Sequence, residues 1–145
     1  MLDLSVYKDE DMGELGVADE GEYDIRLVKF MADKQGEVLR YYGEDDENPY
    51  FNLLFEIIDH PDADNFKDFS YFVNLPAPGD TPKERKVKLN RVNTLGAALG
   101  IEFFGGEPID PLDYNGNVTC SAVLVKTTSE QYGDQNEIKQ ILIER

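Results

Sequence analysis

Aromatic side chains stand next to Lys or Arg in several short segments of this sequence. Arg40, Tyr41 and Tyr42 are consecutive, and Tyr71 and Phe72 form a second aromatic pair. Rings that are exposed on a strand can stack on unpaired bases, at about 1–3 kcal/mol per base, while Lys and Arg contact the phosphates. The pattern therefore indicates a surface for single-stranded nucleic acid. The predicted contact residues are Arg26, Lys29, Arg40, Tyr41, Tyr42, Tyr71, Phe72 and Lys126.

Most aromatic residues on strands belong to a hydrophobic core, and we expect this of Tyr23 and Phe69. Phe72 differs because it lies between Ser70 and Asn74, so its strand neighbours on the same face are polar. The two adjacent tyrosines after Arg40 point to opposite faces of a regular strand, so one of them must be outward.

Motifs for catalysis are absent from the sequence, which contains no phosphate-binding G-x-x-x-x-G-K-[ST], no G-x-G-x-x-G and no G-x-S-x-G. Asp59, Asp62 and Asp64 lie close together, but the glycine and the final glutamate of a calcium loop are missing. His60 has no evident partner for acid–base chemistry. The single cysteine, Cys120, lies among small apolar residues and is expected to pack in the core. We therefore predict a protein that is not an enzyme and uses no metal or cofactor.

The charge of the chain is large and unevenly distributed. Its 145 residues carry 30 acidic and 14 basic side chains, a net charge of −16, and 41% of them are hydrophobic, which is enough for one folded domain. Residues 1–22 have a net charge of −7 and residues 43–68 a net charge of −8, whereas residues 82–92 have a net charge of +4.

This acidity supports an alternative function. A strongly negative protein repels phosphate at long range, so the chain could instead be an acidic interaction protein, a DNA mimic that occupies a basic site on a host or viral nucleic-acid enzyme. The separation of the acids into two blocks favours nucleic-acid binding, because a mimic gains from a continuous acidic face.

The start of the chain has neither a basic leader region nor an apolar one, and no stretch approaches the roughly 18 apolar residues of a membrane span. We expect a cytoplasmic protein without membrane partners, in the host cytoplasm if it is viral.

Hydrophobic periodicity predicts a mainly β chain with one helix. The alternation in residues 22–31, with a slip near Leu27 that suggests a bulge, predicts a strand that forms a hairpin with residues 37–42. Further strands are predicted over residues 50–58, 69–75, 117–126 and 137–143, and a helix over 82–99, capped by Thr81 or Asp80 and ended by Gly100. We predict a five-stranded OB-fold, a Greek-key barrel with its helix between the third and fourth strands. An α+β sheet with one packed helix is the alternative.

Two segments add a resemblance to a known family. RVNTLGAALGI (residues 91–101) and YNGNVTCSAVLVKTTSEQYGDQNEIKQIL (residues 114–142), together with the predicted barrel, resemble bacteriophage-encoded OB-fold proteins that bind single-stranded DNA. The resemblance implies a role in DNA replication or recombination, action without cofactors, self-association to a homo-oligomer, and recruitment of replication or recombination proteins through an acidic tail. This chain departs from that pattern because its acidic extension is N-terminal.

We accordingly divide the chain into an acidic N-terminal arm, residues 1–21, and an OB-fold domain, residues 22–145. The arm is expected to be mobile and to compete with DNA for the basic surface of the domain. Alternatively, its apolar residues Leu2, Leu4, Val6 and Tyr7 add an edge strand or a dimer contact.

Overall fold

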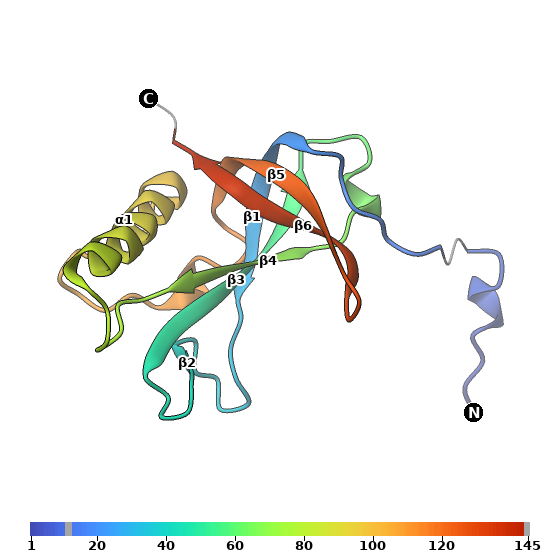
Figure 1. Cartoon of the computed structure of the whole chain (residues 1–145). Helices are drawn as coiled ribbons and strands as arrows, with labels where there is room; N and C mark the ends of the chain where they lie inside the picture. The colour runs from blue at the N-terminus through green and yellow to red at the C-terminus, as the bar shows by residue number, and fades with distance from the viewer. Residues whose placement is uncertain (11–12, 144–145) are drawn as a thin grey trace.

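The structure is a computed structural model that describes residues 1–10 and 13–143. Residues 11–12 of the predicted arm and residues 144–145 at the chain end lie outside the described residues. Within this range the body is an antiparallel sheet of six strands with one α-helix (Figure 1). The strands are β1 (Gly21–Phe30), β2 (Arg40–Tyr42), β3 (Asn48–Ile58), β4 (Phe69–Asn74), β5 (Thr119–Ser129) and β6 (Gly133–Leu142), and the helix is α1 (Pro82–Leu99).

Short 3-10 helices are also present at Ser5–Tyr7, Ala63–Asn65 and Pro111–Asp113.

Strand β3 is the centre of the sheet because it pairs with β1, β2 and β4. The order along the sheet is β2-β3-β1-β5-β6, with β4 on β3 outside this path. The sheet curls so that β4 and β6 come close to each other (Figure 1). No ladder joins these two strands in the part of the chain that is described, so the sheet is open.

The prediction of a mainly β chain with one helix is confirmed, but two finer predictions are wrong. The helix lies between β4 and β5, not between the third and fourth strands, because the short β2 also precedes it. The sheet is not a closed barrel. Helix α1 packs against β4, β5 and β6, so its apolar side covers the opening that a ladder between β4 and β6 would otherwise close.

The predicted hairpin between residues 22–31 and 37–42 is also wrong. Strand β2 is only three residues long and pairs with β3, and β3 takes the place beside β1. Three core side chains of β3, at Leu53, Phe55 and Ile57, lie opposite the core residues of β1. That pairing buries far more apolar surface than residues 37–42 could.

Local signals in the sequence are confirmed. A register shift between Leu27 and Lys29 marks the predicted bulge. Helix α1 begins after Thr81, whose side chain accepts the Glu84 N–H at 3.1 Å, while the Glu84 side chain accepts the Thr81 N–H at 3.1 Å. Gly100 ends the helix with φ of 73°, a left-handed conformation that favours glycine.

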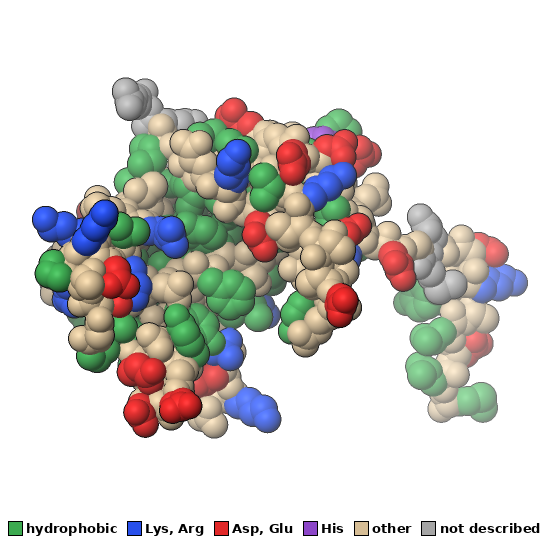
Figure 2. All heavy atoms as spheres, in the orientation of Figure 1, with side chains coloured by type: hydrophobic (Ala, Val, Ile, Leu, Met, Phe, Trp, Pro, Cys, Tyr) green, Lys and Arg blue, Asp and Glu red, His purple; other side chains and the backbone are tan. Residues whose placement is uncertain are grey.

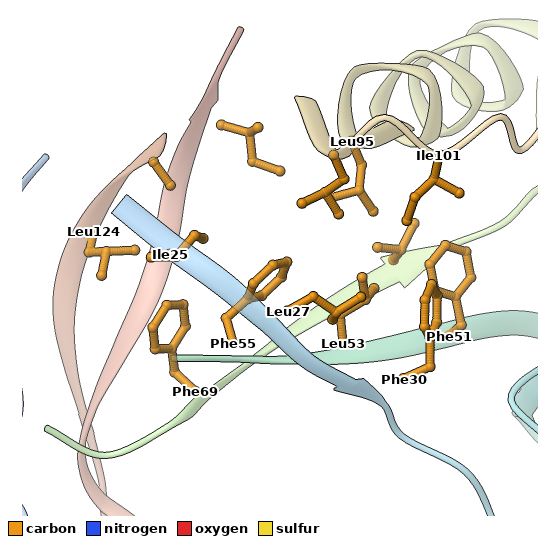
Figure 3. Packing of buried hydrophobic residues seen from close by; sticks show 14 of the residues in the cluster. Ile25, Leu27, Phe30, Phe51, Leu53, Phe55, Phe69, Leu95, Ile101 and Leu124 are labelled. Carbon is orange, nitrogen blue, oxygen red and sulfur yellow. The ribbon is translucent and has the colours of Figure 1, made fainter. Parts of the chain in front are cut away.

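Alternate side chains of the central strands fill one core beneath the helix. Figure 3 shows Leu27 of β1 and Phe55 of β3 on the side of the sheet that faces Leu95 of α1. Phe69 is buried here as expected, and Tyr23 is partly buried against the same core. Because inward residues alternate with outward ones, β3 and β4 leave a second face, called here the outer face, that the helix does not cover.

The root of the predicted arm is attached to the sheet. Gly16 forms an isolated parallel bridge with Phe66, and Ala18 is fully buried. The side chain of Asn136, itself only 2% exposed, holds this root: its Oδ1 accepts the Ala18 N–H at 2.9 Å and its Nδ2 donates to the Ala18 carbonyl at 3.0 Å. By contrast, residues 1–10 are exposed and project away from the body (Figure 1).

Candidate nucleic-acid interface

Three aromatic rings line up across neighbouring strands on the outer face. The centroids of Tyr42 and Tyr50 are 5.7 Å apart, and those of Tyr50 and Phe72 are 6.1 Å apart. Tyr42 is 51% exposed, Phe72 is 56% exposed and Tyr50 is half-buried between them. We call Tyr42, Tyr50 and Phe72 the aromatic row.

The strand register places these rings on one face. Tyr50 lies opposite Arg40, and Phe72 lies opposite Asn52. Residues directly opposite in a ladder share a face, as do residues two apart on one strand. Tyr42 therefore lies on the same face as Arg40, and Tyr50 lies on the same face as Asn52. Their neighbours on β3 point the other way and are buried in the core.

Arg40 supplies a cation beside the row. Its guanidinium carbon lies 5.7 Å from the centroid of the Tyr50 ring, within the range of a cation–π contact. No side-chain hydrogen bond or ion pair to a carboxylate is found for Arg40 among the described residues. Its donors can therefore contact a phosphate while the ring beneath holds the side chain in place.

Two more predicted cations lie on the same outer face. They belong to β1 and are paired with residues nearer the end of β3. Lys29 is opposite Leu54 and is exposed, and Arg26 is opposite Glu56. Arg26 is already paired, because its Nε donates to Glu56 Oε1 at 2.8 Å and its Nη2 donates to the same oxygen. Its charge is thus largely balanced within the protein, whereas that of Lys29 is available.

Lys126 lies elsewhere and has a different partner. It follows Ala122 and Leu124 in the alternation of β5, whose side chains point to the core and not to the outer face. Its Nζ donates to Asp19 Oδ1 at 2.7 Å, and this hydrogen bond lowers the pKa of Asp19 and raises the pKa of Lys126. Asp19 belongs to the predicted arm, so the arm contacts one predicted DNA-binding residue; competition with DNA stays a prediction.

Two predicted tyrosines are also outside the row. Tyr41 is 50% exposed but is opposite Pro49, on the other face of β2 from Tyr42. Tyr71 points to the core side of β4, where burial raises the pKa of its hydroxyl. The structure therefore brings one set of predicted residues onto the outer face: Arg26, Lys29, Arg40, Tyr42 and Phe72. It does not bring Tyr41, Tyr71 or Lys126 there.

The central ring of the row, Tyr50, was missed by the sequence reasoning. It begins the run YFNLLFEII, which is apolar at both parities, so alternation could not assign its face. The one available signal was Asn52, the polar residue two positions later on the same face. Asn52 is only 5% exposed; its Nδ2 donates to Ser70 Oγ at 3.4 Å, and its Oδ1 has no partner among the described protein groups.

Acidic side chains limit one end of this surface. Figure 2 shows carboxylates gathered at the loop between β2 and β3, below the exposed hydrophobic side chains of β3 and β4, and Lys and Arg gathered over α1. The loop residues Glu44, Asp45, Asp46 and Glu47 are all exposed. Carboxylates repel phosphate, so this end of the outer face is unfavourable for a nucleic-acid backbone.

The surroundings of His60 and Cys120, and the arrangement of possible metal ligands, give no sign of catalysis or metal binding among the described residues. His60 Nδ1 accepts the Asp62 N–H at 3.0 Å, and its ring lies 5.2 Å from that of Phe66. Burial, together with the charge of Asp24, raises the pKa of Cys120 to about 11, so its thiol is protonated at neutral pH. Over residues 1–10 and 13–143, no group of three or more His, Cys, Asp or Glu side chains is arranged to hold a metal ion.

No helix in the described part of the chain is long and apolar enough to cross a membrane. Comparison with known proteins assigns no family, because no family model matches the sequence and no curated protein matches it.

Proposed function

We propose that this protein binds single-stranded DNA without catalysing a reaction. The observation that carries the proposal is the aromatic row on one face, with Tyr42 and Phe72 exposed, Tyr50 half-buried between them and Arg40 beside them. Bases stack on such rings at about 1–3 kcal/mol each, and stacking requires no particular base. Duplex DNA hides the faces of its bases, so the same surface discriminates against it.

The proposal extends to the fold. Its support is the pairing of five strands, β1 with β3 and β5, β3 with β4, and β5 with β6, while no ladder joins β4 to β6 among the described residues. The OB-fold is a partly open barrel that binds oligonucleotides on the face of its second and third strands. With β2 regarded as part of the loop after β1, the strands β3 and β4 take those positions. They carry Tyr50 and Phe72, which supports both parts of the proposal.

The biological setting we propose is the replication or recombination of a bacteriophage genome in the host cytoplasm. Its support is the resemblance carried by residues 91–101 and 114–142. The same resemblance suggests replication or recombination proteins as partners.

One observation favours the alternative, an acidic protein that mimics DNA. Three basic side chains are neutralised by carboxylates: Arg26 by Glu56, Lys126 by Asp19, and Lys88 by Asp80 at 2.8 Å. Of the predicted cations on the outer face, Lys29 and Arg40 then remain for phosphates, so the salt dependence of DNA binding should be shallow. With Lys29 and Arg40 as contacts, log K should fall with log[salt] at roughly −1 to −2.

Fluorescence anisotropy with a labelled oligo(dT) and with a duplex of equal length tests the proposal at low salt. We expect the single strand to bind, with quenching of tyrosine fluorescence, and the duplex to bind much more weakly. A double variant, Tyr42→Ala with Phe72→Ala, should lose most of this affinity. Tyr132→Ala is the matched control, because Tyr132 is 64% exposed but lies outside the row. Absence of single-strand binding, or tighter duplex binding, would overturn the proposal.

A further inference from the structure

Cations that the proposed function does not use gather on helix α1. Three of them, Lys83, Lys86 and Arg91, are exposed, and no ion pair to a carboxylate is found for them among the described residues. Lys88 of the same helix differs, because its Nζ donates to both carboxylate oxygens of Asp80, at 3.0 Å and 2.8 Å. In a chain with a net charge of −16, a group of unpaired cations indicates a surface for an anionic partner. We call Lys83, Lys86 and Arg91 the α1 cations.

The packing of α1 leaves these three side chains toward solvent. The core residues of the helix, among them Val92 and Leu99, are buried and lie on one side of it. With 3.6 residues per turn, Lys83 and Lys86 lie on the opposite side and Arg91 lies on the flank between the two. A partner can therefore contact the α1 cations without disturbing the core.

Helix α1 lies next to the free edge of β4. Strand β4 pairs with β3, and among the described residues no ladder occupies its other edge, where α1 packs. The loop between them, residues 75–81, is held to the helix by the ion pair of Asp80 with Lys88. Burial raises the pKa of the Tyr71 hydroxyl on β4, and the charge of Arg91 acts against this rise. The middle of α1 is thus close enough to β4 for its charge to act there.

The aromatic row runs across the strands toward this edge. Its rings belong in order to β2, β3 and β4, with centroids 5.7 Å and then 6.1 Å apart. Beyond Phe72 the sheet ends at the free edge of β4, and α1 follows (Figure 1). The two ends of this surface have opposite charge in Figure 2, with carboxylates at the loop between β2 and β3 and with Lys and Arg over α1. A polyanion that lies along the row is therefore repelled at one end and attracted at the other.

We infer that a single strand held on the aromatic row continues over the free edge of β4 and places its next phosphates against the α1 cations. The inference rests on the proposed function and extends it, because it sets the direction of the bound strand and the length of its site. Three rings hold about three bases, whereas folds of the OB type hold about 4–16 nucleotides each. An acidic peptide would also match the charge of α1, but the aromatic row that leads to the helix favours nucleic acid.

The salt dependence of binding by a short and a long strand tests this inference. Oligo(dT) of five nucleotides covers the row, and its log K should fall with log[salt] at roughly −1 to −2. Oligo(dT) of fifteen nucleotides also reaches α1, and its slope should be steeper by about 2, since each of three further contacts adds about 0.7. Equal slopes overturn the inference and leave the proposed function standing. Absence of binding by both strands overturns the proposed function, and this inference with it.

Two variants that remove the same amount of charge locate the contact. The α1 variant, in which Gln keeps a high helix propensity, carries Lys83→Gln, Lys86→Gln and Arg91→Gln. The control variant removes three exposed cations on other elements by Lys8→Gln, Lys34→Gln and Lys139→Gln. Each variant loses three positive charges, so the change in long-range repulsion is similar in both.

The two variants should differ with the long strand and agree with the short one. We expect the α1 variant to return the slope of the fifteen-nucleotide strand to that of the five-nucleotide strand, and the control variant to leave it unchanged. Neither variant should alter the slope for the five-nucleotide strand, and an unchanged melting temperature verifies folding. A long-strand slope that the α1 variant leaves unchanged, or that the control variant lowers equally, overturns the inference.

An acidic peptide decides which class of partner α1 prefers. A labelled peptide of fifteen glutamates has a charge similar to that of the long strand, but it has no bases to stack on the row. We expect it to bind much more weakly than the fifteen-nucleotide strand. Tighter binding of the peptide, lost in the α1 variant, overturns the inference and assigns α1 to an acidic segment of another protein.

Discussion

The two faces of β3 and β4 use the same kinds of side chain in opposite ways. On the core face Phe55 is fully buried and lies 6.1 Å from the ring of Phe69. On the outer face the ring of Phe72 is at the same distance from Tyr50, yet it is 56% exposed. Ring contacts alone therefore do not separate a core from a binding surface. The difference is whether another layer covers the rings, and only the core face has α1 above it.

The largest expected effect is on the core face. Phe55→Ala should lower the free energy of unfolding by about 3–5 kcal/mol, since it leaves a cavity in a packed interior. Phe72→Ala, the same substitution on the outer face, should cost less than about 1 kcal/mol. Urea denaturation of both variants measures this. Similar losses at the two positions would mean that the outer face is also a packed core.

For the affinity for single-stranded DNA, in contrast to stability, the outer face is expected to matter most. Phe72→Ala is expected to weaken binding to single-stranded DNA by about 1–3 kcal/mol, roughly 5-fold to 150-fold in Kd, because one stacking platform is lost. The measurement is anisotropy titration at fixed salt. Tyr41→Ala is the control, since Tyr41 is equally exposed but on the other face of β2. A larger loss from Tyr41→Ala would place the site on that other face.

Asn52 is a buried polar residue on the outer face, and it sharpens the comparison. Its Oδ1 has no partner among the described protein groups. Asn52→Leu, which replaces the amide by methyl groups on the same branched skeleton, should therefore raise the free energy of unfolding by about 1 kcal/mol. Thermal or urea denaturation checks the sign, and a destabilised variant would show that Oδ1 is satisfied in solution.

The smallest expected effect is on the salt dependence of binding, and it distinguishes a cation without a carboxylate partner from one that is paired within the protein. Arg40→Ala should make the salt dependence of log K shallower by about 0.7, the loss of one phosphate contact on a single strand. Lys126→Ala should leave the slope unchanged, because Lys126 is paired with Asp19 and lies off the outer face. Anisotropy titrations at several salt concentrations give both slopes. A change for Lys126→Ala and none for Arg40→Ala would exchange their roles.

Part of the candidate site could be predicted from single segments. Phe72 was predicted as a contact residue because its neighbours on the same face, Ser70 and Asn74, are polar, and its ring is exposed. The two adjacent tyrosines were expected on opposite faces, and Tyr41 and Tyr42 are. Tyr50 could not be predicted, because its apolar neighbours at both parities conceal its face. The partners of Arg26 and Lys126 could not be predicted either, because Glu56 and Asp19 lie 30 and 107 residues away in the sequence.

By itself the sequence determined the features that depend on residues a few positions apart. The capping pair Thr81 and Glu84, and the left-handed Gly100, set both ends of α1. The tertiary structure alone decided which strands meet. Strand β3 displaced residues 37–42 from the edge of β1, and α1 covered the gap between β4 and β6. The physical reason is that these arrangements compete through the apolar area buried between distant segments, which no local pattern contains.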